Sequence, residues 1–163
     1  MSKAPGTPAT VALTAAGIAF TAHTYDHEAG STDFGMEAAA KLGVDPARVF
    51  KTLVAETDAG LVVGIVPVSG MLDLRALADA VGAKRAVMAD RILAERKTGY
   101  VLGGISPIGQ RSRLRTVVDA SALEHATILV SGGRRGLDLE LDPRDLLAMT
   151  DGVAAVIRRS GRL

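Results

Sequence analysis

The sequence predicts an α+β domain built on a mixed β-sheet. Some of its apolar, strand-like runs are joined by tight turns, as in hairpins, while others alternate with helical segments, as parallel strands do. The length of 163 residues suits one domain, which would bury about two-thirds of its unfolded surface. Because the chain has no internal repeat, low-complexity tract or long linker, we expect residues 1–163 to form a single domain.

Five helices are expected from residues that begin and end helices. Thr7-Pro8 combines an N-cap with proline at the first helical position, Asp73 caps a later helix, and Pro143 opens the last one. A glycine stops each of the first three helices. The expected helices cover residues 8–16, 35–42, 73–81, 90–97 and 143–149.

The expected strands lie between these helices, and two pairs of them form hairpins. Asp58-Ala59-Gly60 is typical of a hairpin turn, and Gly132–Gly136 connects a second pair. The run 61–68 is apolar on both faces, which favours a central place in the sheet. Strands are expected at residues 18–25, 49–56, 61–68, 86–88, 116–119, 127–131, 137–141 and 153–157.

Composition excludes several kinds of site. The chain has no cysteine, so it has no disulfide, no thiolate zinc site and no cysteine nucleophile, which fits a reducing cytoplasm. It has no run of about 18 apolar residues and no signal-peptide core near residue 1, so we expect no contact with a membrane. Aromatic residues make up only 3% of the chain, so the core must be aliphatic.

Positive charge gathers in the last third of the chain. The net charge of +1 does not by itself indicate a nucleic-acid-binding protein, but residues 101–163 hold nine basic side chains against seven acidic ones. All nine are arginine, and eight of them cluster at 111–115, 134–135 and 158–162. Arginine suits bidentate contact with phosphate. A solvated surface is the alternative interpretation, and the charge pattern leaves both open.

Lys51 is the first candidate for a functional side chain. It lies in the apolar run Val49–Val54, where strand alternation places it on the face of Val49 and Leu53. A lysine on a buried face must be paired, lose its charge or line a cavity, because an unpaired buried ammonium is costly. A lysine on an edge strand that reaches water along its aliphatic stem is the alternative.

Two glycine-rich segments, Thr98–Gln110 and Ser131–Leu141, follow apolar runs and suggest the walls of a pocket. Glycine lets a ligand approach the main chain, and the loop from Gly103 to Gly109 can offer backbone N–H groups to an oxygen. Neither segment is a nucleotide-binding motif, and ordinary tight turns are the alternative. A hairpin would bring Ser131 close to Asp138, although Ser131 lacks the flanks of a nucleophile elbow.

The histidines indicate no metal site. His23 and His27 are four residues apart, a spacing that shares a face only on a helix, and this segment is predicted to be a strand and a loop. No third ligand is evident. His125 ends a further short helix that the sequence predicts beside the five above, and a surface or capping role is expected there.

Five segments together resemble the YbaK family of aminoacyl-tRNA editing deacylases. They are HTYDH at 23–27, FKTLV at 50–54, PVSGMLDLRALADAVGAK at 67–84, TGYVLGGISPIGQ at 98–110 and SGGRRGLDLEL at 131–141. The resemblance covers essentially the whole chain. It implies a mixed, barrel-like β-sheet flanked by helices, as in the editing domain of prolyl-tRNA synthetase.

The resemblance also implies a site and a reaction. Lys51 and Thr52 match a Lys-Thr pair of the family, and the expected catalytic set is Lys51, Thr52, Tyr25, Ser131 and Asp138. The expected substrate-binding residues are Gly103, Gly104, Gly133, Ser106 and Arg134. The implied reaction is hydrolysis of mischarged Cys-tRNA(Pro) in trans, in which the substrate's own thiol attacks its ester.

Partners and alternatives follow from the same resemblance. The expected partners are aminoacylated tRNA(Pro) and, transiently, prolyl-tRNA synthetase, with no DNA, cofactor or metal. Prolyl-tRNA synthetase needs such editing because a pocket separates near-isosteric side chains by only about 10- to 200-fold. One alternative is a deacylase for another small residue, such as alanine on tRNA(Pro). Another is a non-catalytic adaptor that binds tRNA or the synthetase, although the presence of Lys51 argues against a decayed site.

Overall fold

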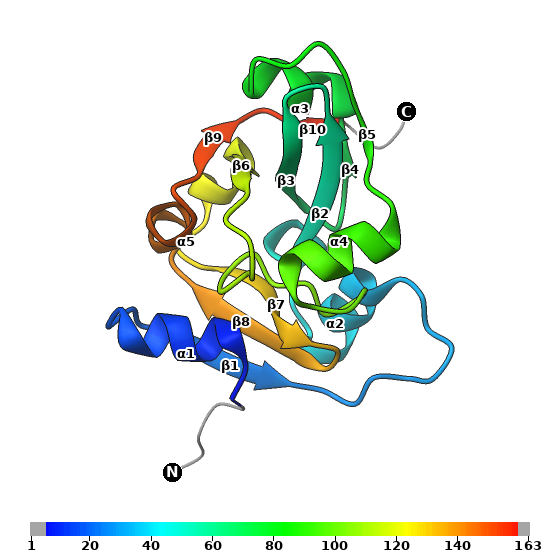
Figure 1. Ribbon diagram of the computed structural model, residues 1–163. Helices are drawn as coiled ribbons and strands as arrows, with labels where there is room; N and C mark the ends of the chain where they lie inside the picture. Colours follow the sequence, from blue (N-terminus) through cyan, green and yellow to red (C-terminus); the bar gives the residue numbers. More distant parts are fainter. Residues whose placement is uncertain (1–5, 160–163) are drawn as a thin grey trace.

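Residues 6–159 of the computed structural model are described here, and they form five α-helices and ten strands (Figure 1). The helices are α1 (Pro8–Ala15), α2 (Phe34–Leu42), α3 (Leu74–Ala80), α4 (Arg91–Thr98) and α5 (Pro143–Thr150), and single 3₁₀ turns lie at Pro46–Arg48 and Ala120–Glu124. The predicted capping is confirmed: the Thr7 hydroxyl accepts a hydrogen bond from Thr10 N, and Gly43 ends α2 in the left-handed conformation.

The larger sheet has five strands in the order β5-β2-β3-β6-β9. Its strands are β2 (Phe50–Thr57), β3 (Gly60–Pro67), β5 (Ala86–Met88), β6 (Arg115–Asp119) and β9 (Val153–Ala155). The pairs β5-β2 and β2-β3 are antiparallel, while β3-β6 and β6-β9 are parallel, so the sheet is mixed as predicted. The strand expected to be central, β3, lies in the middle.

A second sheet has three antiparallel strands in the order β1-β8-β7. Its strands are β1 (Thr21–Thr24), β7 (Ile128–Arg134) and β8 (Leu137–Leu141), and a further pair joins β4 (Met71–Leu72) to β10 (Arg158–Arg159). The hairpin differs from the prediction, because β7 continues past Ser131 through a bulge to Arg134. The bulge uses Gly133 at φ +108°, a value that favours glycine.

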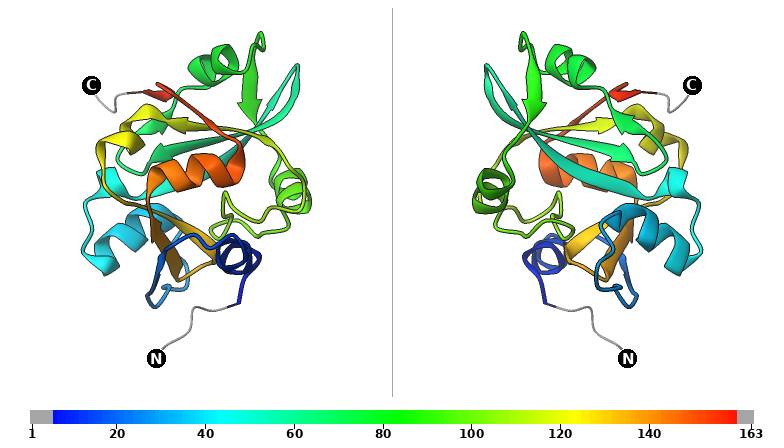
Figure 2. Two further views of the ribbon diagram at one scale, coloured as in Figure 1. Left: turned by 90° about the vertical axis from the view of Figure 1, so that its left-hand side faces the viewer. Right: turned by 90° about the vertical axis from the view of Figure 1, so that its right-hand side faces the viewer.

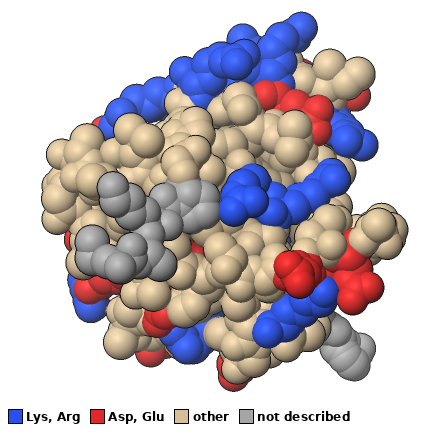
Figure 3. Space-filling model, turned by 90° about the horizontal axis from the view of Figure 1, so that it is seen from below, with Lys and Arg blue, Asp and Glu red and all other residues tan. Residues whose placement is uncertain are grey.

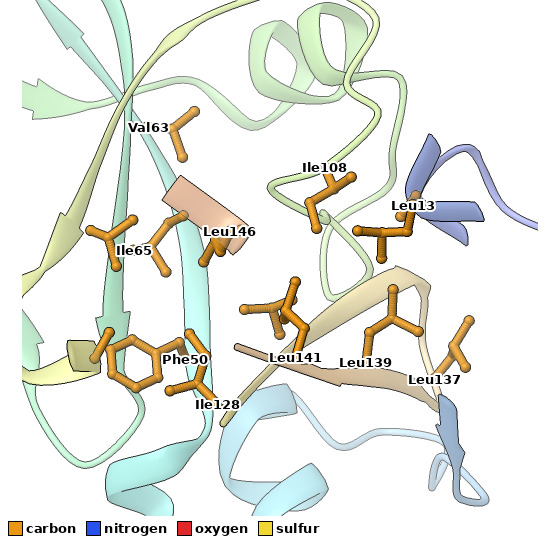
Figure 4. Close-up of a cluster of buried hydrophobic side chains, with 14 of the residues drawn as sticks. Leu13, Phe50, Val63, Ile65, Ile108, Ile128, Leu137, Leu139, Leu141 and Leu146 are labelled. Carbon is orange, nitrogen blue, oxygen red and sulfur yellow. The ribbon is translucent and has the colours of Figure 1, made fainter. Parts of the chain in front are cut away.

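The expected barrel-like sheet is divided into two main sheets, which meet at a bridge between Val49 and Leu129. The two sheets share one core. Phe50 and Ile65 of the larger sheet pack in the same buried cluster as Leu137, Leu139 and Leu141 of the smaller one (Figure 4). Helices α1 and α5 lie on the outside of this core in the two side views (Figure 2). As expected, nearly all of the core is aliphatic.

No helix within residues 6–159 is long and apolar enough to cross a membrane. The same residues contain no group of three or more His, Asp or Glu side chains that could hold a metal ion.

Candidate active site

A cavity of about 470 Å³ lies where the start of β2 meets the polar face of the three-stranded sheet. This volume is in the range of small-molecule sites, about 300 to 1,000 Å³. Two loops complete the wall, one leading into α2 and one following α4. The lining residues are Tyr25, Thr32, Asp33, Phe34, Gly35, Ala38, Val49, Phe50, Lys51, Thr52, Leu102, Gly103, Ile105, Ser131 and Asp138.

Lys51 and Thr52 both line the cavity from the beginning of β2. Within residues 6–159 the Lys51 ammonium forms no ion pair, so its charge is available to a ligand. The Thr52 hydroxyl is buried and has no hydrogen-bond partner in the same part of the chain. A buried hydroxyl without a partner costs free energy, which suggests that a ligand supplies the missing bond.

Asp138 lies on β8, the middle strand of the smaller sheet, directly opposite Ser131 of β7. Only 6% of the residue is exposed, and this burial raises the pKa of the Asp138 carboxyl to about 7. No hydrogen bond or ion pair to this carboxyl forms among the described side chains. Burial, and then the charge of Asp138, raise the pKa of the Tyr25 phenol to about 12.

The side chains do not form a serine-hydrolase triad. His23, Asp138 and Ser131 are in register across the three strands, but the carboxylate lies in the middle. Adjacent strands are about 4.8 Å apart, so His23 and Ser131 are separated by roughly 10 Å. A triad needs the imidazole beside the hydroxyl. His23 Nε2 lies instead 2.8 Å from Glu140 Oε1. The other carboxylate oxygen of Glu140 accepts a hydrogen bond from Arg48.

Phe34, the first residue of α2, forms a wall of the cavity that the sequence did not identify as part of the site. Its ring packs against Gly103, where an added Cβ would lie 2.8 Å from the ring. Asp33 caps the helix, and His27 Nδ1 lies 2.7 Å from Glu37 Oε1 and holds the preceding loop to α2. An aromatic residue at the start of a helix gave no signal, because its role depends on contact with a distant loop.

The structure thus brings together six of the ten expected site residues, namely Tyr25, Lys51, Thr52, Gly103, Ser131 and Asp138. The other four do not line the cavity. Ser106 is fully buried, and its hydroxyl accepts a hydrogen bond from Ile108 N.

Gly104 and Gly133, two of these four residues, are glycine because the chain packs too closely there for a side chain. A Cβ at Gly104 would lie 2.8 Å from the Arg134 backbone, and one at Gly133 would lie 2.8 Å from the Tyr100 ring. The Arg134 side chain is on the exposed end of β7.

Comparisons with known proteins show the family to which the chain belongs. The model of the aminoacyl-tRNA editing domain matches residues 32–149, which include the starts of both α2 and β2 and the whole β7-β8 hairpin. The chain belongs to the aminoacyl-tRNA editing domain family. It is also 40% identical over 120 residues to EbsC of Enterococcus faecalis, named as a candidate Cys-tRNA(Pro)/Cys-tRNA(Cys) deacylase, with 73% of each chain covered. Membership confirms the YbaK resemblance and the predicted class of enzyme, an aminoacyl-tRNA deacylase.

Two solved structures share the fold of this family member. A hypothetical protein, APE2540, superposes with a TM-score of 0.84 at 27% identity, over 94% of this chain and all of that one. A candidate trans-editing enzyme for prolyl-tRNA synthetase gives a TM-score of 0.80 at 24% identity, over 93% of this chain and 95% of that one. The predicted α+β fold, a mixed sheet flanked by helices, is confirmed.

Proposed function

We propose that this editing domain hydrolyses Cys-tRNA(Pro) in trans, with the cysteine thiol of the substrate as the attacking group. The supporting observation is the content of the cavity. It holds a lysine, two carboxyls and an unpartnered hydroxyl, and no histidine or cysteine of residues 6–159 lines it. Such a set can position an ester and stabilise charge, and it contains no serine–histidine or cysteine–histidine pair.

The proposed reaction begins when the substrate thiol loses its proton to water. The resulting thiolate attacks the carbonyl carbon of the same aminoacyl group, the ester C–O bond breaks, and the leaving ribose oxygen takes a proton from water. Water then opens the cyclic thioester and releases cysteine. Holding reacting atoms in contact can contribute about 7–11 kcal/mol, so a site that mainly positions the substrate is sufficient.

The lining residues take separate parts in this proposal. The Lys51 ammonium faces the negative charge that develops on the carbonyl oxygen. The Thr52 hydroxyl donates to the ester and so gains the partner that it lacks. Asp138, with Tyr25 beside it, holds the α-ammonium group, because a buried carboxylate binds a cation that replaces its lost hydration. Ser131 and Gly103 shape the cavity wall next to the cysteine side chain of the substrate.

The partners of this reaction are also proposals. The tRNA brings phosphates to a surface on which basic side chains gather in a band along one edge and in a second group (Figure 3). Arginines are favourable for such contacts. A transient complex with prolyl-tRNA synthetase would deliver the mischarged tRNA, and such a complex would operate in the cytoplasm, where translation occurs.

Single-turnover deacylation of Cys-tRNA(Pro), Ser-tRNA(Pro) and Ala-tRNA(Pro) tests the proposal, with Lys51→Ala as the variant. We expect rapid loss of cysteine only, because serine has a similar size and no thiol. We also expect the variant to lose activity and keep the fold. Hydrolysis of Ala-tRNA(Pro) would change the assigned substrate from the cysteinyl to the alanyl ester. It would also exclude thiol assistance, because alanine has no thiol. Inactivity on all three would favour a tRNA- or synthetase-binding adaptor.

A further inference from the structure

Arg135 is held beside the mouth of the cavity by two contacts. Its Nε donates a hydrogen bond to the Leu102 carbonyl oxygen at 2.9 Å. Its guanidinium carbon lies 4.8 Å from the centroid of the Phe34 ring, a cation–π distance. Leu102 and Phe34 both line the cavity. The guanidinium therefore has a fixed position at the rim, although the side chain is exposed.

Gly103 allows this arrangement. Its φ of +86° favours glycine, and an added Cβ would lie 2.8 Å from the Phe34 ring and 2.9 Å from Arg135 Nε. Phe34, Gly103 and Arg135 come from three separate segments, namely α2, the loop after α4 and the β7-β8 turn. They pack as one unit, which we call the rim cluster.

The terminal nitrogens of Arg135 remain available. Within residues 6–159, Nη1 and Nη2 form no hydrogen bond or ion pair. Glu95 is the acidic neighbour: the Leu102 N–H and then the Arg91 side chain lower its pKa, with a smaller contribution from Arg135. Glu95 Oε2 accepts from Leu102 N and pairs with Arg91, and within residues 6–159 Glu95 forms no ion pair with Arg135, so the outer edge of that guanidinium stays open.

We propose that Arg135 binds the 5′ phosphate of the 3′-terminal nucleotide of the tRNA, and that Phe34 orients its guanidinium for this contact. The proposal rests on the proposed function. When the aminoacyl-adenosine occupies the cavity, its 5′ phosphate is the first charged group outside. Two parallel N–H groups suit bidentate binding of phosphate oxygens. The resemblance implied Arg134 in a substrate-binding role, but Arg134 does not line the cavity, and its side chain forms no hydrogen bond or ion pair within residues 6–159.

The test compares two substrates that differ in this phosphate. One is Cys-tRNA(Pro), and the other is cysteinyl-adenosine without a 5′ phosphate. For Arg135→Gln we expect kcat/KM on the tRNA to fall by about 10- to 100-fold, the effect of one charge-assisted hydrogen-bonded contact. The same variant should act on cysteinyl-adenosine like the unchanged protein. Arg134→Gln is the matched control, for which a much smaller loss on the tRNA is expected.

A salt titration of tRNA binding gives a readout that does not require hydrolysis. Losing one phosphate contact should reduce the slope of log K against log salt by about 0.7 to 1 in Arg135→Gln. Arg135→Lys and Phe34→Leu should both weaken tRNA binding, because the positive charge at position 135 loses its fixed orientation. Both variants keep that charge, so the salt slope should stay close to that of the unchanged protein.

Either of two results would overturn the proposal. One is an equal loss on both substrates in Arg135→Gln, which indicates a role in shaping the wall. The other is an unchanged salt slope in that variant. If the unchanged protein hydrolyses neither ester, the proposed function fails, and the salt slope alone decides whether Arg135 contacts a phosphate.

Discussion

Two polar groups of the cavity are poorly solvated in residues 6–159: the Thr52 hydroxyl is buried without a hydrogen-bond partner, and the Asp138 carboxyl is mostly buried and forms no hydrogen bond or ion pair there. The loss of water lowers the stability of the ligand-free protein at each position. In native proteins such groups are few, and each needs an explanation, such as a catalytic role or a bound water or ion. Stability and activity should therefore respond in opposite directions when either group is removed.

Thr52→Val should separate the two effects. Valine fills the same volume without the hydroxyl, so we expect the free energy of unfolding to rise by about 1 kcal/mol. In a domain of this size that corresponds to a melting temperature about 2–4 °C higher. Single-turnover deacylation should be slower in the same variant. Thermal unfolding and the kinetic assay provide the measurements.

Thr116→Val is the matched control for this substitution. Thr116 is also buried, but its hydroxyl donates to the Leu114 carbonyl oxygen at 3.1 Å. Valine there removes a satisfied hydrogen bond, so a loss of stability and unchanged deacylation are expected. Equal stability changes at the two positions would show that the Thr52 hydroxyl carries no special cost.

Asp138→Asn should change how stability depends on pH. The folded-state pKa of about 7 exceeds the ordinary value of 3.8, so the folded protein keeps a proton that the unfolded chain releases. The contribution of Asp138 is therefore most favourable below pH 3.8 and declines as pH rises through about 7, by about 1.4 kcal/mol per pH unit.

The comparison of Asp138→Asn with the unchanged protein isolates this decline. Asparagine does not titrate, so the difference in unfolding free energy should grow between pH 4 and 7, in favour of the variant. Other carboxyls, such as Glu140, have lowered pKa values and act below this window in both proteins. Denaturant unfolding at several pH values measures the difference. A constant difference across the window would contradict the burial of this carboxyl.

At the scale of the elements, the loop after α4 packs tightly on the β7-β8 hairpin. A Cβ added at Gly104 would lie 2.8 Å from the Arg134 backbone, which cannot rotate away as a side chain can. We expect Gly104→Ala to cost about 1–3 kcal/mol and to lower deacylation, because the loop carries Gly103. At Gly6 an added Cβ meets nothing within 4 Å, so Gly6→Ala is the control. Denaturant unfolding of both variants is the measurement.

Most of these elements could be predicted from local signals. Caps and glycines gave the five helices within one or two residues, since each signal acts within its own turn. The strands β4 and β10 were missed, because two residues carry no periodic pattern and form only where Met71 meets Arg159. Strand β1 was expected over 18–25 and is limited to Thr21–Thr24 by the length of its pairing with β8.

The candidate site could be predicted only in part for a similar reason. Tyr25, Lys51, Thr52, Ser131 and Asp138 are polar residues at strand ends or inside apolar runs, which is a visible signal, and the resemblance gave their roles. The rim cluster is different. Neither Phe34 nor Arg135 differs from ordinary residues of a helix start or a turn, and only tertiary contact with Gly103 places them at the cavity.

For the molecule as a whole, one buried cluster connects the two main sheets. It includes Phe50 and Ile65 from the larger sheet and Leu139 from the smaller one, together with Leu13 of α1 and Leu146 of α5. If either sheet unfolded alone, the other would expose its side of this cluster, although the larger sheet has a second buried cluster against α3. We therefore propose that residues 1–163 act as a single domain and unfold in one cooperative transition.

Phe50→Ala tests this proposal, because the ring is 2% exposed and lies beside the bridge between the sheets. We expect a loss of about 3–5 kcal/mol, as for other buried aromatic residues. The chain has no tryptophan and only two tyrosines, so tyrosine absorbance reports Tyr25 and Tyr100 around the smaller sheet. Far-ultraviolet circular dichroism reports all strands and helices. Both transitions should shift together in the variant, and two separate midpoints would show that the sheets unfold independently.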